Sequence, residues 1–201
     1  LALGFVLVLY NLGRTLWAGR PLPLPARFFV AGLCGVAAAA SLGLIFAFVL
    51  TGLATAPPLA DLAASGLPLH IVAGVGGWLT LSAMGVSYRL LAMFILAPED
   101  RRWTSIAALW GGIGVLLLAV GGGAGAVLLN ADPTPVFVAA ALLAVPVLAA
   151  YGHDVIRLYA KRKRRKLETN SLMAAPALIS LALAAALLLA LLALGQMPRF
   201  A

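Results

Sequence analysis

Long uninterrupted runs of apolar residues constrain this chain more than any other feature of its sequence. Five runs of twenty or more residues, and a shorter one at the start, are separated by short segments rich in proline or charged side chains. About twenty apolar residues in a helix span the hydrocarbon core of a bilayer. Because the runs are continuously apolar and do not alternate, helices are favoured over the strands of a β-barrel. We therefore expect an all-α, polytopic transmembrane helix bundle.

Breaker residues and charges mark the ends of about six helices in one transmembrane domain covering residues 1–201. The chain opens directly in an apolar run without a methionine, so we expect it to be a piece of a longer protein whose first helix is partial. The expected helices cover residues 1–17, 28–53, 68–96, 104–129, 135–159 and 171–194. The segments between them are expected to be loops.

Composition supports the lipid bilayer as the solvent of this chain. Hydrophobic residues make up 64% and charged residues only 10%, against roughly half and a quarter in soluble domains. The net charge of +8 comes from loops and helix ends, which is typical of membrane orientation and not of a nucleic-acid-binding surface. We expect no nucleic-acid partner. Cys34 stands alone inside an apolar run, which indicates a small buried hydrophobic residue.

The placement of lysine and arginine predicts the orientation. All but one of the 14 basic residues fall around the first, third and fifth connections, and only Arg199 lies on the opposite side. The positive-inside rule then places both termini outside, in a multi-pass protein of the cell inner membrane. The run from Lys161 to Lys166 is expected to anchor this topology and to contact anionic lipids.

His70 is the most informative residue for function, because an ionisable side chain in a membrane helix is a candidate functional site. Helical spacing places His70, Gly74 and Gly77 on one stripe of the third expected helix. The two glycines leave a shallow groove beside the imidazole. A flat macrocycle with His70 as its axial metal ligand fits such a groove, and so does a closely packed neighbouring helix.

The segment from His70 to Phe94 resembles the second core helix of the large subunit in the heme-copper oxidase superfamily. The resemblance is strongest to nitric oxide reductases and subunit I-like relatives, and it rests on His70, Trp78, Gly85 and Tyr88. It implies that His70 binds the iron of a low-spin heme b, in a respiratory-chain protein that serves electron transport. Gly74 and Gly77 would then contact that heme.

The departures from that family limit the activity. Its catalytic centre needs several further histidines, and this chain has only His153 to offer. Reduction of oxygen or nitric oxide by these residues alone is therefore excluded. His153 is also expected roughly 20 Å deeper in the membrane than His70, so the two cannot bind one heme together. A second heme ligand would come from a missing segment, a partner chain or Met197.

Two other functions are consistent with the sequence. The chain could be a cofactor-free accessory or assembly subunit of a larger membrane complex, in contact with other membrane subunits. It could also be a small-solute transporter, because Pro146, Pro176 and glycine patches would kink and smooth its helices. We assign His153 to a cluster with Asp154 and Arg157 at the inner end of the fifth expected helix. The glycines at 111–114 and 121–125 are interpreted as packing surfaces.

Overall fold

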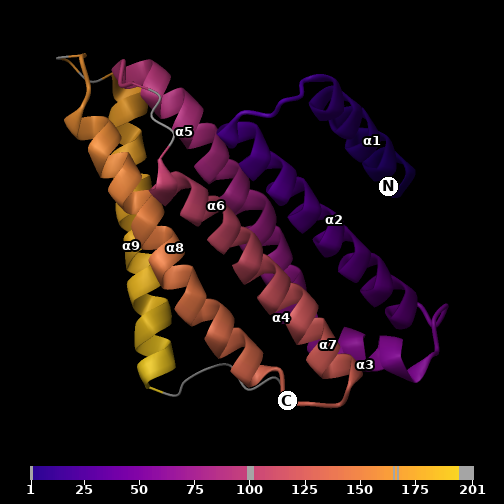
Figure 1. Cartoon of the computed structure of the whole chain (residues 1–201). Helices are drawn as coiled ribbons and strands as arrows, with labels where there is room; N and C mark the ends of the chain where they lie inside the picture. The colour runs from indigo at the N-terminus through magenta and orange to yellow at the C-terminus, as the bar shows by residue number, and fades with distance from the viewer. Residues whose placement is uncertain (1, 99–101, 165, 167, 195–201) are drawn as a thin grey trace.

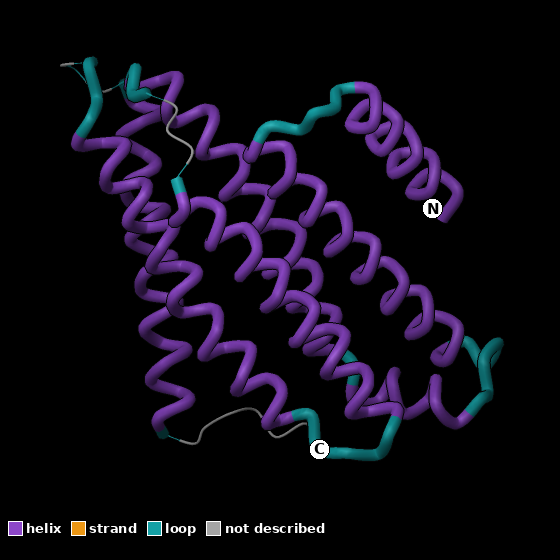
Figure 2. Tube along the Cα trace, viewed as in Figure 1, coloured by secondary structure: helices purple, strands orange, loops and turns teal. Residues whose placement is uncertain are grey.

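The computed structural model describes residues 2–98, 102–164, 166 and 168–194, and every regular element among them is helical (Figure 2). Within these described residues, five spans are long and apolar enough to cross a membrane, which confirms the expected all-α transmembrane bundle. The shorter first helix, α1, covers Ala2–Ala18. The five spans are α2 (Leu24–Leu50), α4–η1–α5 (Leu67–Ile71, Val72–Leu81, Ser82–Ile95), α6–η2–α7 (Trp103–Leu116, Leu117–Gly122, Gly123–Leu128), α8 (Thr134–Ala160) and α9 (Thr169–Ala193).

The structure differs from the sequence expectation at the start of α2 and in the connection that follows α2. The α2 helix begins four residues earlier than expected, at Leu24, because Pro25 lies in its first turn, where the missing N–H has no intrahelical acceptor to lose. The connection after α2 is not a plain loop. It contains a short helix, α3 (Pro57–Ser65), that begins with Pro57 in its own first turn. Gly52 allows the turn between α2 and α3, since its φ of +72° is costly for other residues.

Two spans contain π-helical turns that the apolar pattern does not reveal. η1 extends over ten residues and includes Gly74, Gly76 and Gly77. The Thr80 hydroxyl donates a hydrogen bond to the Val75 carbonyl five residues earlier, at 2.9 Å, and so follows the wider π turn. π-helical turns are frequent at functional sites. Here η1 is the segment that contacts α2 most extensively.

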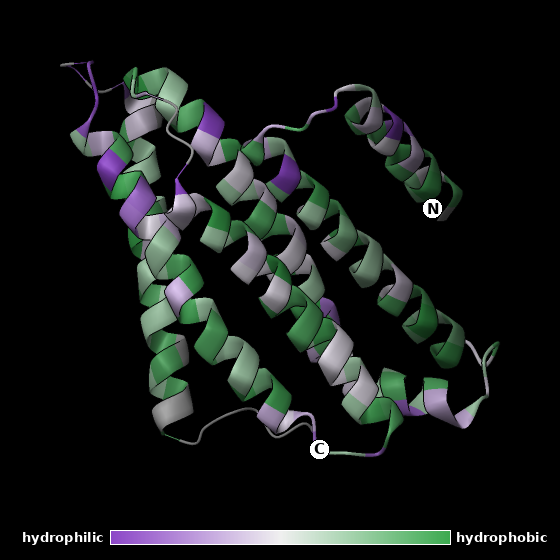
Figure 3. Cartoon of the chain, viewed as in Figure 1, coloured by the Kyte–Doolittle hydropathy of each residue, from purple (hydrophilic) through white to green (hydrophobic). Residues whose placement is uncertain are grey.

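The spans alternate in direction, so the connections after α1, α5 and α8 lie at the same end of the bundle (Figure 1). The hydrophilic residues of this end stand out in Figure 3, where the remaining length of each span is mostly hydrophobic. We call it the basic end. The main core lies beside it, between α2, α5, α6 and α8, and includes Phe28, Met84, Ile95 and Val155. This arrangement is that of a multi-pass membrane protein.

α1 stands apart from the rest of the bundle (Figure 1). A cleft of about 300 Å³ separates it from α2, with Leu16 and Trp17 on one wall and Leu33 and Cys34 on the other. Cys34 is exposed in this cleft, so its expected burial is wrong within this chain. The Arg20 guanidinium lies over the Trp17 ring, 3.5 Å from its centroid, at the basic end of α1.

Candidate functional site

The three residues predicted to form a site, His70, Gly74 and Gly77, lie along one contact with α2. We call this contact the α2 seam. Its facing pairs are Gly35 with Gly77, Ala39 with Gly74, and Gly43 with His70. Because α2 and the α4–η1–α5 span run antiparallel, residue numbers along this contact rise on one helix as they fall on the other. His70, Gly74 and Gly77 therefore all face the same neighbouring helix.

At Gly77 the two helices meet backbone to backbone. A Cβ atom added at Gly35 would lie 2.7 Å from the Gly77 Cα, and one added at Gly77 would lie 2.8 Å from Leu116 Cδ1. Real Cβ atoms do not come so close to other heavy atoms. At Gly74 the fit is looser, since the nearest atom to an added Cβ is that of Ala39 at 4.0 Å. The seam therefore depends on having no side chain at Gly35 and Gly77.

The His70 ring packs against α2 from the end of α4. Its Cε1 atom lies 3.2 Å from the position of a Cβ added at Gly43, and its ring centroid is 5.8 Å from that of Phe46. Nδ1 of His70 is buried and has no hydrogen-bond partner among the described residues. A buried polar atom without a partner costs free energy, and it is the one feature of this site that packing alone does not explain.

The packing of the seam does not fit a macrocycle on the Gly74–Gly77 face. The Gly35 backbone fills the groove at Gly77, and Gly43 and Phe46 cover the imidazole on its Cε1 side. Metal-bound histidines usually donate their second ring N–H to a carbonyl or carboxylate, and Nδ1 has no such acceptor among the described residues. Heme could reach His70 only from the side of the ring that faces away from Gly43.

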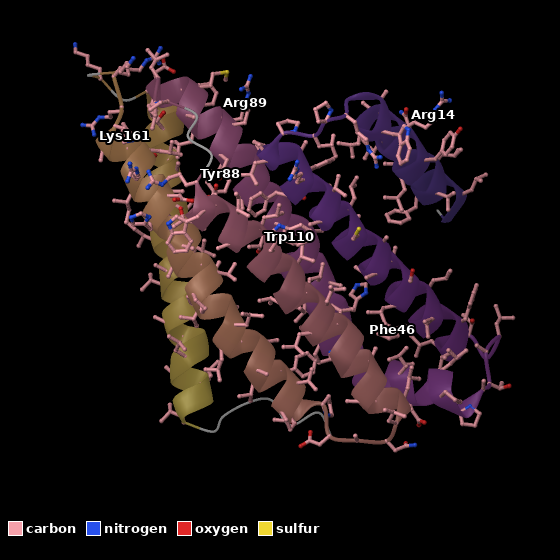
Figure 4. All side chains as sticks on the ribbon, viewed as in Figure 1. Arg14, Phe46, Tyr88, Arg89, Trp110 and Lys161 are labelled. Carbon is pink, nitrogen blue, oxygen red and sulfur yellow. The ribbon has the colours of Figure 1, made fainter. Side chains whose placement is uncertain are left out.

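A second polar site lies toward the basic end and centres on Asp154 of α8. This carboxylate is buried, with 5% of its surface exposed. The Tyr88 hydroxyl donates to Oδ2 at 3.0 Å, and the Thr104 hydroxyl donates to Oδ1 at 2.5 Å. Three transmembrane spans are thus joined through one carboxylate. Figure 4 shows Tyr88 on its span near the basic end.

The polar contacts continue from Asp154 along the same helices. Tyr151, one turn before Asp154, shares a hydrogen bond of 2.7 Å with Ser87, and its ring meets that of Tyr88 edge to face. His153 lies beside Asp154, with Nδ1 3.7 Å from Oδ1, but its side chain is 59% exposed. The expected proximity of His153 and Asp154 is confirmed. Arg157 makes no ion pair with Asp154, so the expected three-residue cluster is only partly formed.

His70 and His153 belong to opposite ends of the bundle. His153 lies beside Asp154, which Tyr88 binds, and Tyr88 follows His70 by five turns, roughly 25 Å, along one continuous span. A shared metal between the two histidines is therefore excluded. The described residues contain no group of three or more His, Cys, Asp or Glu side chains close enough to hold a metal ion. Met197 lies outside the described residues.

Sequence reasoning missed the Asp154 network. It treated Tyr88 as part of the resemblance to heme-copper oxidases and Thr104 as the first residue of a helix. The available signal was the coincidence of an acid, a tyrosine and a threonine at the same depth on three consecutive spans. Whether such groups meet depends on which faces of the helices are in contact. The depth of a residue in the membrane does not reveal that.

Comparisons with known proteins add no family to this description: no family model, curated protein or solved structure matches the chain.

Proposed function

We propose that the chain is a cofactor-free accessory or assembly subunit of a larger complex in the cell inner membrane. The backbone contact between Gly35 and Gly77 carries this proposal. At the position where the resemblance to heme-copper oxidases implies a heme, α2 of the same chain packs directly against Gly77. The glycines then serve helix packing, the role that small residues commonly have in membrane interiors.

The cleft between α1 and α2 is where we propose that the complex forms. An isolated helix in lipid gains stability by packing against other helices, and α1 leaves an apolar cleft lined by Gly13 and Ala37 as well as larger side chains. No atom lies within 4 Å of a Cβ added at Gly13. The occupant that we propose is a transmembrane helix of a partner subunit, whose apolar side chains would enter this largely apolar cleft between α1 and α2.

A photo-crosslinking experiment tests the proposed contact. A benzoylphenylalanine introduced at Leu33, which lines the cleft, should crosslink to a membrane protein of defined mass in native membranes. The same group at Leu142, which is 57% exposed on α8 away from the cleft, is the matched control. Crosslinks from Leu33 to lipid alone, or equal protein crosslinks from both positions, would contradict a partner in the cleft.

A second candidate function rests on His70 as a half-buried ionisable side chain within a membrane span. In this alternative the chain is a heme-copper-oxidase-like subunit that binds a low-spin heme b through His70. The protein's contribution would be to hold the imidazole in place by its contacts with Gly43 and Phe46. Bound heme would supply one-electron transfer. This alternative requires a second ligand from outside the described residues.

A reduced-minus-oxidised absorption spectrum of protein purified from native membranes separates the two candidates. The accessory proposal expects no heme band at stoichiometric intensity. A band that is lost in His70→Ala and retained in His153→Ala would overturn it in favour of heme ligation. His153→Ala is the matched control because it removes the other histidine, whose side chain is exposed.

A further inference from the structure

A pocket opens at the basic end of the bundle, between the start of α2 and the ends of α5 and α8. Its volume is about 270 Å³, and we call it the basic-end pocket. Tyr88 and Asp154 belong to its wall, so it adjoins the buried polar network. Its lining residues are Leu22, Pro23, Leu24, Pro25, Arg27, Tyr88, Pro98, Arg102, Asp154, Arg157, Leu158 and Lys161.

The side chains around this pocket carry an excess of positive charge. Among the described residues that line it, four carry a positive charge and one, Asp154, a negative charge. The positive ones are Arg27 on α2, Arg157 on α8, Arg102 just before α6 and Lys161 just after α8. Both Asp154 oxygens already accept hydrogen bonds from the Tyr88 and Thr104 hydroxyls. The hydrogen bonds of this carboxylate therefore point into the bundle, and it forms no ion pair with Arg27 or Arg157.

Arg157 is the residue of this pocket whose positive charge most clearly lacks a partner. Its Nε atom is buried and has no hydrogen-bond partner among the described residues. Arg27 uses its own Nε to donate to the Leu22 carbonyl at 3.0 Å, which holds the guanidinium at the start of α2. Within the described part of the chain neither arginine pairs with a carboxylate. A partly buried guanidinium without a counter-ion is unfavourable, which indicates that an anion completes this pocket.

We propose that the basic-end pocket binds a phosphate group. Guanidinium groups bind phosphate oxygens through two parallel hydrogen bonds, and arginines on different helices can hold such a group from two sides. Basic pockets between transmembrane helices are typical sites for phosphorylated lipid headgroups. The pocket lies at the helix ends, the level of a membrane surface, so an anionic phospholipid and a soluble phosphate can both supply this chemistry. This inference is independent of which candidate function holds.

Lipid retention by the full chain tests the proposal. The protein is extracted from vesicles of phosphatidylglycerol and phosphatidylcholine in equal parts, and the bound phosphatidylglycerol is measured by native mass spectrometry. Arg157→Gln and Arg27→Gln should each lower retention about fivefold, the ratio that corresponds to about 1 kcal/mol per basic residue at an anionic surface. Arg14→Gln is the matched control, since Arg14 lies on α1, away from Tyr88 and Lys161 (Figure 4).

A second arm identifies the source of the phosphate. Millimolar inorganic phosphate is added to both proteins. If it displaces phosphatidylglycerol from the wild-type protein but not the phosphatidylglycerol that Arg157→Gln still retains, the pocket also accepts soluble phosphate. If it has no effect on a retention that the two variants lower, the site is specific for a lipid headgroup. Equal retention by Arg157→Gln, Arg27→Gln and Arg14→Gln would overturn the proposal. Arg27 is exposed, so its variant keeps the test decisive even if Arg157→Gln does not fold.

Discussion

Gly35 of α2 and Gly77 of η1 are in contact through their backbones, with no room for a side chain between them. This contact joins the two helices that share the largest interface in the described chain. It also explains why η1 can contain a costly glycine-rich sequence. The backbone freedom of glycine destabilises a helix, and close packing against α2 offsets that cost.

The α2 seam predicts opposite effects for two matched substitutions. Gly77→Ala should lower stability by about 1–3 kcal/mol, because its Cβ would clash with Gly35 and Leu116. Gly121→Ala on η2 should be neutral or stabilising, because no atom lies within 4 Å of its Cβ and alanine favours a helix over glycine by about 1 kcal/mol. Thermal unfolding in detergent measures both. Equal melting temperatures for the two variants would show that the seam is not tightly packed.

The buried carboxylate predicts a large loss of stability when it is removed. Asp154→Ala should destabilise the bundle by roughly 2–3 kcal/mol, because the Tyr88 and Thr104 hydroxyls lose a charged acceptor. Asp61→Ala is the matched control. Asp61 is exposed on α3, and surface substitutions usually change stability by less than about 0.5 kcal/mol. Comparable unfolding midpoints for the two variants would contradict a structural role for Asp154.

A double-mutant cycle then isolates the Tyr88–Asp154 hydrogen bond. Tyr88→Phe should destabilise the wild-type protein measurably, because Oδ2 of Asp154 loses its donor. The same substitution should have little effect in the Asp154→Ala background, where no acceptor remains. The difference between the two changes in unfolding free energy is the coupling energy, which we expect to be about 1 kcal/mol. Additive effects would mean that the hydroxyl does not contribute through Asp154.

Much of the fold could be predicted because the bilayer imposes one rule on every span. Apolar length sets the existence of a helix, and the ends of the third, fourth and fifth expected spans agree with the structure within about a turn. The helix α3 was missed because Pro57 and Pro58 mark a helix start as readily as a loop. The π-helical turns were missed because they change hydrogen bonding without changing which residues are apolar.

The candidate site was predictable only as far as a single helix allows. The stripe of His70, Gly74 and Gly77 follows from helical spacing, but its neighbour does not, and α2 fills the groove. The glycine patches divide in the same way. Gly111 and Gly112 pack against Val147 and Leu81, whereas Gly121 and Gly125 have open space around them. Spacing cannot distinguish a glycine that meets a helix of its own chain from one that faces outward.

The gathering of the basic connections at one end predicts the sidedness of the membrane topology. Once the native Cys34 is replaced by alanine, a single cysteine at Asp61 or Asp132 should react with an impermeant maleimide in intact cells. Asp61 lies on α3 and Asp132 between α7 and α8, both at the end opposite the basic connections (Figure 1). A cysteine at Lys163 should react only after permeabilisation, because the positive-inside rule retains this connection in the cytoplasm. Asp132 is a strong reporter because it is exposed in its turn. Labelling of Lys163 in intact cells, with protection of Asp61 and Asp132, would reverse the orientation and place the basic-end pocket at the outer surface.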